Sequence, residues 1–290
     1  MMDRIGILAG WGRFPVVVAE KLKQQNKQVY CLGIKDHADP QLADICDGFV
    51  ETGIAKLGAH MRFYQSHKVQ HATMAGKIFK AKLLYQGHWI RHLPDWTTLR
   101  FAGPNFVFKS KNCNDNALLL SVVAAYAAHG ITFAPATDFA PELLVKHCQE
   151  SGRRITSALE RDIEFGWQIA KEMGRLDIGQ TVIVKDRAIV AVEAIEGTDE
   201  CIRRAGTLCC KGGFTVVKVA KPQQDMRFDV PTIGLGTLEM MAQVGGRVLV
   251  VESEKTIIID EQDVIEFANK HNIAIITKRD GEALCISGAA

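Results

Sequence analysis

Opposite charges are concentrated in one stretch of the C-terminal half, which runs from Lys218 to Asp229. It reads Lys-Val-Ala-Lys-Pro-Gln-Gln-Asp-Met-Arg-Phe-Asp, so Asp225 and Asp229 flank an arginine. Hard divalent cations prefer carboxylate oxygens, and Mg²⁺ usually takes only one or two of them from a protein. Lysine and arginine neutralise charge on a phosphoryl group. The stretch therefore predicts a metal-assisted phosphate site, and a solvated loop of paired charges is the alternative.

A second acidic cluster, Glu193-Ala-Ile-Glu-Gly-Thr-Asp199, follows an apolar run. Two glutamates three residues apart at the end of a strand can both reach one metal ion. Thr198 or Asp199 can cap the helix that we expect next. Capping alone would explain Thr198, but it would not explain Glu193 at the end of the apolar strand.

A glycine loop near the start, Gly10-Trp-Gly12, lies between an expected strand and an expected helix, and Arg13 follows it. Glycines let a backbone approach an oxyanion, and N–H groups at a helix N-terminus face it. Pro15 occupies the place of the third glycine of the dinucleotide fingerprint, and no acidic residue ends the second strand, so NAD binding is disfavoured. A tight turn without a ligand is the alternative.

The elements that must position these residues alternate in the N-terminal part. We expect four strands with helices between them, and this alternation is typical of a parallel, doubly wound sheet. The expected strands are 4–9, 28–33, 48–52 and 71–76, and the expected helices are 14–25, 57–68 and 115–129. Ligands of such sheets bind beyond the carboxyl ends of the strands. Gly10, Gly12, Gly76 and Lys77 would all fall on that edge.

Hairpins and helices alternate in the second part, which predicts a mixed sheet. The expected hairpins are 181–192, with a turn at Asp186-Arg187, and 247–260; the other elements are strands 214–220 and 273–276 and helices 159–173, 198–205, 236–243 and 261–271. We therefore predict an α/β protein with a Rossmann-like parallel-sheet domain at 1–135, a mixed α/β catalytic domain at 136–280 and a tail at 281–290.

Charge is divided unevenly along the chain of 290 residues, whose net charge is +2. Residues 1–135 hold 16 basic and 9 acidic side chains, and the rest holds 19 and 24, so the two parts carry +7 and −5. A basic part and an acidic part suit a phosphate-bearing ligand with a metal on the acidic side. Uneven surface charge is the alternative.

Several classes of protein are disfavoured by the same sequence. The 8 cysteines lack metal-ligand spacing, the histidines show no zinc motif, and no leader precedes Arg4, so we expect a reducing, cytoplasmic location. No apolar run is long enough to span a membrane. The basic residues are not interleaved with aromatics in a recognisable motif, so we expect no nucleic acid partner.

Three segments together resemble a known family. They are Gly6–Pro15, Asp186–Asp199 and Lys218–Pro231, and the resemblance extends from about residue 4 to residue 276. The sequence is similar to the LpxI-type UDP-2,3-diacylglucosamine pyrophosphatases of lipid A biosynthesis. The resemblance implies attack of water on the α-phosphorus of that substrate with a divalent metal, Mg²⁺ or Mn²⁺. The products would be UMP and 2,3-diacylglucosamine 1-phosphate, which is lipid X.

The resemblance also assigns residues. Asp225 matches the aspartate that the family needs for catalysis, and the matching motifs suggest roles for the others. We expect catalysis by Asp225, Glu196 and Asp229. We expect these three residues and Glu193 to bind the metal. Expected substrate-binding residues are Gly10, Gly12, Arg13, Gly76, Lys77, Gly197, Thr198, Lys218, Lys221 and Gln224.

Two departures from the family pattern bear on these assignments. Asn116 stands where a second acidic residue is expected after Asp115, and Trp11 stands where a small or polar residue is usual. Another nucleotide-sugar pyrophosphatase and a nucleotide-binding sensor without turnover are the rival functions. Peripheral contact with the inner membrane and a homodimer are further expectations.

Overall fold

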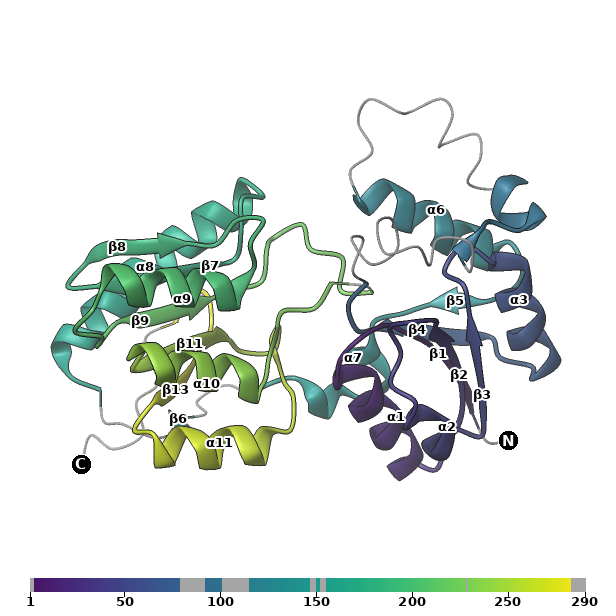
Figure 1. Cartoon of the computed structure of the whole chain (residues 1–290), viewed down its shortest axis with the longest axis horizontal. Coiled ribbons are helices and arrows are strands. Elements are labelled where there is room, and N and C mark those ends of the chain that lie inside the picture. Colours follow the sequence, from purple (N-terminus) through teal and green to yellow (C-terminus); the bar gives the residue numbers. More distant parts are fainter. Residues whose placement is uncertain are drawn as a thin grey trace. The chain divides into compact units, whose positions relative to one another are not determined.

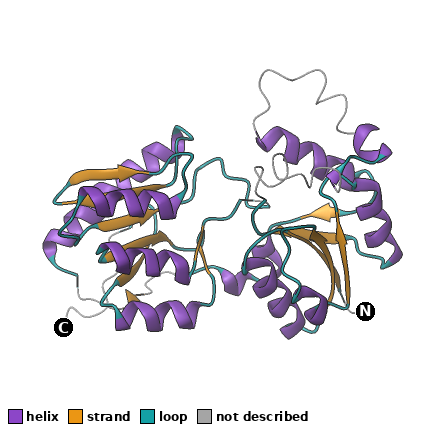
Figure 2. Ribbon diagram, in the orientation of Figure 1, coloured by secondary structure: helices purple, strands orange, loops and turns teal. Residues whose placement is uncertain are grey.

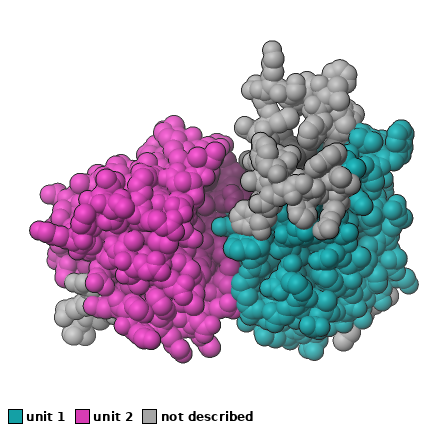
Figure 3. Space-filling model, viewed as in Figure 1, with its two compact units in different colours: residues 1–141, 226–228 teal, residues 142–225, 229–290 magenta. Residues whose placement is uncertain are grey.

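The computed structural model describes residues 3–78, 92–100, 115–146, 150–151, 155–227 and 229–282. The chain forms two compact units, which Figure 3 colours separately. Unit 1 comprises Met1–Pro141 with Met226–Phe228, and unit 2 comprises Glu142–Asp225 with Asp229–Ala290. The main division therefore falls between Pro141 and Glu142, whereas the sequence placed it near residue 135. Residues 283–290 of the predicted tail lie outside the described residues.

Unit 1 is built on a sheet of five parallel strands in the order β3-β2-β1-β4-β5 (Figure 1). The strands are β1 (Arg4–Ala9), β2 (Gln28–Ile34), β3 (Gly48–Thr52), β4 (His71–Ala75) and β5 (Thr132–Phe133). Its described helices are α1 (Phe14–Gln24), α2 (Leu42–Ile45), α3 (Leu57–Ser66), α6 (Asp115–Ala127) and α7 (Ala136–Phe139). The predicted parallel sheet is confirmed, and its carboxyl edge follows Ala9 and Ala75.

The core of unit 1 lies between the sheet and helices α3 and α6, and it includes Tyr64 and Tyr126. Strand β1 has a glycine where the ring of Tyr64 approaches, since a Cβ on Gly6 would lie 2.7 Å from Tyr64 Cε1. Helix α1 is in contact with β1, β2 and β4 but contributes no residue to this cluster. The central strand is therefore covered on both faces, as parallel sheets require.

A buried histidine joins α3 to α6 inside this core. His60 Nε2 lies 3.0 Å from the Gly53 carbonyl oxygen, which can only accept, so Nε2 carries the proton. Nδ1 then accepts from the Tyr126 hydroxyl at 2.6 Å. Burial lowers the pKa of His60 to about 4 and raises the pKa of Tyr126, so both groups are neutral near pH 7.

This histidine predicts a pH dependence of stability. Its pKa is lower in the folded chain than the value of about 6.5 in an unfolded one, so its contribution is present above pH 6.5. We expect about 3 kcal/mol of unfolding free energy to be lost as the pH falls from about 6.5 to about 4. Urea unfolding at a series of pH values measures the slope. His60→Gln should flatten it and His71→Gln, at an exposed site, should not; an unchanged slope in His60→Gln contradicts the account.

Unit 2 is built on a six-stranded mixed sheet in the order β6-β13-β11-β9-β7-β8 (Figure 1). Its strands are orange in Figure 2. The strands are β6 (Glu150–Ser151), β7 (Thr181–Lys185), β8 (Ala188–Val192), β9 (Thr215–Lys218), β11 (Val248–Glu252) and β13 (Ala274–Lys278). Strand β11 pairs in parallel with β9 and β13, whereas β7 is antiparallel to β8 and β9. The predicted mixed sheet is confirmed.

The first predicted hairpin is confirmed as β7–β8, and its turn works without a glycine. Asp186 and Arg187 adopt φ angles of 51° and 58°. The buried carboxylate of Asp162 accepts both of their N–H groups, at 2.9 and 2.7 Å. These two hydrogen bonds offset the cost of the left-handed backbone.

The second predicted hairpin, at 247–260, is wrong. Strand β11 lies between two parallel neighbours, and β12 (Ile257–Ile258) pairs with β10 (Thr232–Ile233) in a separate two-stranded sheet. The physical reason is that β11 is buried along its whole length. A continuous apolar run is typical of an interior parallel strand rather than of a hairpin with one solvated face.

Helices cover both faces of this sheet. Helix α8 (Ser157–Arg175) packs on one face, and α9 (Thr198–Leu208), α10 (Leu235–Val244) and α11 (Glu261–Lys270) pack on the other. The strands β8, β9, β11 and β13 all end at one edge. A buried charged residue stands at each of these ends: Glu193, Lys218, Glu252 and Lys278. Burying a charged side chain is costly unless it is paired. Four such residues at one edge therefore mark this edge as the candidate active site of unit 2.

In the described part of the chain, no helix combines the length and the apolar composition that a bilayer crossing needs.

Candidate active site

The two glycine loops of unit 1 lie directly against each other. Trp11 N donates to Lys77 O at 2.8 Å, and Lys77 N donates to Trp11 O at 2.9 Å. A Cβ on Gly10 would lie 2.7 Å from Lys77 O, and a Cβ on Gly76, whose φ is 91°, would lie 2.8 Å from Gly10 C. Loop packing alone therefore explains the glycines at 10 and 76. Gly12, with φ 107° and no atom within 4 Å of its Cβ position, has open space beside it.

Arg13 stands at the start of α1 and is paired within its own helix. Its guanidinium donates to both oxygens of Glu20, at 3.2 and 3.1 Å. Trp11 is about half exposed, and backbone atoms form its bridge to Lys77. The structure thus brings Gly10, Gly12, Gly76 and Lys77 together at the carboxyl edge, as the sequence predicts.

A chain of polar contacts joins the ends of β8 and β9 in unit 2. Lys218 Nζ donates to Thr198 Oγ1 at 3.0 Å and to Thr232 O at 2.9 Å. The Thr198 hydroxyl donates in turn to Glu193 Oε1 at 3.1 Å. Lys218 and Glu193 are only 5% and 7% exposed. The structure thus connects three predicted site residues, from two strand ends and one helix start, through a single hydroxyl.

This hydroxyl belongs to the first residue of α9. Gly197 precedes it with φ 85°, a conformation that favours glycine. Because N–H groups at a helix N-terminus face outward and carry partial positive charge, Gly197 and Thr198 stand where an anionic group can be received. Lys218 adds a positive charge beside this helix start, since its Nζ lies 3.0 Å from Thr198 Oγ1.

Glu196 is held away from that chain of contacts. Its Oε1 accepts from Arg204 at 2.6 Å, and its Oε2 accepts from the amide of Ala194 at 3.1 Å. Hydrogen bonds from its own amide and from Arg204 hold the pKa of Glu196 below its usual range. Both oxygens are therefore occupied, and a catalytic or metal-binding role would require Glu196 to exchange these partners.

The loop after β9 carries the remaining predicted residues. Lys221 Nζ pairs with Asp177 Oδ1 at 2.7 Å, and the Lys221 amide donates to Gln224 Oε1 at 3.0 Å. Asp229 N donates to the main-chain oxygen of Asp225 at 3.0 Å, so the two aspartates are one turn apart. Asp225 is half-buried, and Asp229 is exposed.

The predicted set of four metal ligands is not gathered in this structure. In the described ranges, no three His, Cys, Asp or Glu side chains come close enough to form a metal site. Glu193 nevertheless fits a cation, because its Oε2 is buried without a hydrogen-bond partner. Since Mg²⁺ is commonly held by one or two carboxylates together with water and substrate phosphates, a single carboxylate oxygen of this kind is a sufficient protein contribution.

Sequence reasoning missed four residues that shape this edge: Asp177, Thr181, Thr232 and Glu252. Thr181 Oγ1 lies 3.5 Å from Thr198 Oγ1, and Thr232 offers only a backbone oxygen to Lys218. Only Glu252 leaves a signal, since it ends an apolar strand just as Glu193 does. The other three are recognisable only through their neighbours in space.

Both units match domains of one known protein family. Residues 4–143 match the LpxI N-terminal domain, and residues 146–276 match the LpxI C-terminal domain. The chain belongs to the LpxI family. A relative from Caulobacter vibrioides, UDP-2,3-diacylglucosamine pyrophosphatase LpxI, is 27% identical over 286 residues, which cover 95% of this chain and 97% of the relative.

Similarity to solved structures is slight. A biotin carboxylase–β,γ-ATP complex from Campylobacter jejuni has a TM-score of 0.24 and 10% identity, covering 71% of this LpxI chain and 42% of that one. The biotin carboxylase domain of a single-chain bacterial carboxylase has a TM-score of 0.21 and 16% identity, covering 65% and 37%.

Proposed function

We propose that this LpxI family member hydrolyses the diphosphate of UDP-2,3-diacylglucosamine, with Mg²⁺ or Mn²⁺, in lipid A biosynthesis. The observation that carries the proposal is the match to a pyrophosphatase of that name over nearly the whole of both chains. The geometry agrees, because the carboxyl edge of unit 2 combines a buried cation, a helix N-terminus and carboxylates. These are groups that bind and activate a diphosphate.

Each residue of the site has a role in the proposal. The N–H groups of Gly197 and Thr198 receive a diphosphate oxygen, and Lys218 adds a positive charge beside them. Lys221, now paired with the exposed Asp177, changes partner to reach the second phosphate. Asp225 orients the attacking water, and Gln224 holds the loop through the Lys221 amide.

In this proposal, Glu193 Oε2 and a carboxylate oxygen of Asp225 would hold the cation. Asp229 lies one turn after Asp225 along the chain. When bound, the cation supplies Lewis-acid polarisation of the phosphoryl oxygens. The protein contributes the placement of these carboxylates, and the lysines neutralise the rest of the diphosphate charge.

Attack of water at the α-phosphorus is the finer part of the proposal, and it gives UMP and lipid X. Hydrolysis in water enriched in heavy oxygen tests it, because the label enters the phosphate that is attacked. Label in UMP is the expected result. Label in the lipid phosphate would place the attack at the β-phosphorus and would contradict this part while leaving the pyrophosphatase activity intact.

We also propose that the protein works on the cytoplasmic side and contacts the inner membrane peripherally, because the substrate carries two acyl chains. Substrate profiling separates the rival enzyme. Equal turnover of a UDP-sugar without acyl chains would favour a general nucleotide-sugar pyrophosphatase.

A further inference from the structure

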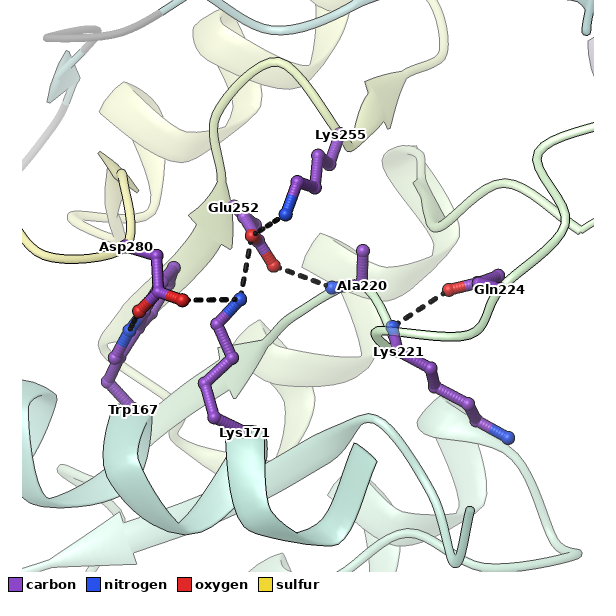
Figure 4. A network of polar contacts seen from close by, with 8 residues as sticks. All are labelled: Trp167, Lys171, Ala220, Lys221, Gln224, Glu252, Lys255 and Asp280. Carbon is purple, nitrogen blue, oxygen red and sulfur yellow. Dashed lines mark hydrogen bonds and ion pairs between the residues drawn. The ribbon is translucent and has the colours of Figure 1, made fainter. Parts of the chain in front are cut away.

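Glu252 is the most deeply buried of the charged residues at the carboxyl edge of unit 2. It ends β11 and is 1% exposed. Its Oε1 accepts from Lys171 Nζ at 2.7 Å and from Lys255 Nζ at 2.8 Å, and its Oε2 accepts from the amide of Ala220 at 2.9 Å (Figure 4). A buried carboxylate destabilises the fold unless it is fully paired. Here three donors pair with Glu252.

The amide of Ala220 lies just beyond the end of the sheet. The last pair between β9 and β11 joins Lys218 to Val251, so the next rung of the ladder is missing. Val219 N donates to Gln180 O at 3.0 Å, and the carboxylate of Glu252 receives the amide that follows. Glu252 thus continues the hydrogen bonding of β9 for one residue and sets the direction in which the chain leaves the sheet.

The direction of that exit matters because the loop with Asp225 begins there. Lys221 is the next residue, and its amide is fixed by Gln224 Oε1 at 3.0 Å. Gln224 N donates back to Lys221 O at 3.1 Å, which closes a turn one residue before Asp225. A continuous series of contacts therefore leads from Glu252 to the loop (Figure 4).

The other side of Glu252 is anchored to the rigid part of unit 2. Lys171 belongs to α8 and lies 3.4 Å from Asp280 Oδ2. Asp280 Oδ1 accepts from the indole of Trp167, on the same helix, at 3.3 Å. Trp167 is buried in the core between α8 and the sheet. The carboxylate therefore connects the loop to a helix and to the end of β13.

We propose that Glu252 is a positioning residue for the hydrolytic reaction, which holds the exit of β9 and with it the loop that carries Asp225. The inference rests on the proposed function. Glu252 does not touch the substrate; it acts through the Ala220 amide. Removing its charge should therefore lower kcat more than it raises KM.

Glu252→Gln tests the inference, and Glu164→Gln is its matched control. Glu164 lies on α8 and pairs with the buried Lys278 at 3.0 Å, so it stabilises the same helix at the same edge without contacting Ala220. We expect Glu252→Gln to speed hydrogen exchange of the Ala220 amide at least tenfold and to lower kcat about tenfold, with KM changed less than threefold. The control should change neither the exchange nor kcat.

Equal losses in both variants would mean that only the stability of unit 2 is affected, and would overturn the inference. Exchange in the wild-type protein gives a second test that needs no variant. The Ala220 amide should exchange as slowly as the ladder amide of Val217; exchange as fast as at the exposed Gln223 would also overturn it. Absence of UMP release by the wild-type protein would instead contradict the proposed function.

Discussion

Asp225→Asn is expected to lower kcat for UMP release by roughly 100- to 1,000-fold, the range seen when one preorganised catalytic group is removed. The substitution removes a charge but keeps the shape of the side chain. The turn that connects the two aspartates uses the main-chain oxygen of Asp225, so the loop should keep its conformation. Steady-state rates with UDP-2,3-diacylglucosamine, together with an unfolding curve, measure the effect.

Asp263→Asn is the matched control for this variant. Asp263 is an exposed aspartate in the first turn of α11, in the same unit. It should keep the wild-type rate. A folded Asp225→Asn protein with wild-type kcat would remove Asp225 from the mechanism.

Lys218→Met is expected to destabilise the protein by about 2–4 kcal/mol, because it leaves the Thr198 hydroxyl and the Thr232 carbonyl without their charged donor. Lys218 is 5% exposed and contacts Thr198 and Thr232, so its loss affects the start of α9 and strand β10 together. Activity should fall as well, since the anion-receiving end of α9 loses its positive charge. Urea unfolding measures the free-energy change.

Two further variants make this prediction specific. Lys221→Met removes a lysine whose partner, Asp177, is 72% exposed, and should cost about 1 kcal/mol or less. The double variant Lys218→Met with Glu193→Gln should lose less stability than the sum of the single variants, because the two residues share one contact chain. Additive losses, or a Lys218→Met protein as stable as the wild type, would contradict the role assigned to this chain of contacts.

Elements of the fold that depend on neighbouring residues could be predicted from the sequence. The β7–β8 hairpin was predicted from two apolar runs and a two-residue turn, although the support of that turn by Asp162 comes from a different segment. The predicted hairpin at 247–260 was wrong, because the partners of a strand depend on how much of it is buried in the assembled sheet. The full burial of β11 reveals its two parallel neighbours only once the sheet is assembled.

The site followed from the sequence less completely. Glu193, Thr198 and Lys218 were each predicted, and the common edge of β8 and β9 brings them together. Gly10 and Gly76 were predicted as ligand-binding glycines. In the structure each glycine lets its own loop pack closely against the loop that carries the other. This packing joins segments 66 positions apart in the sequence. The partner of Lys221 could not be predicted either, because Asp177 is 44 positions away.

The most direct test of the proposed activity is UMP release from UDP-2,3-diacylglucosamine by the purified wild-type protein, with Mg²⁺ and with a chelator. The account predicts release of UMP together with a lipid monophosphate when Mg²⁺ is present. It predicts loss of that release with the chelator and recovery when excess Mg²⁺ is added. A folded protein that releases no UMP with Mg²⁺, or releases it equally with the chelator, would contradict the account.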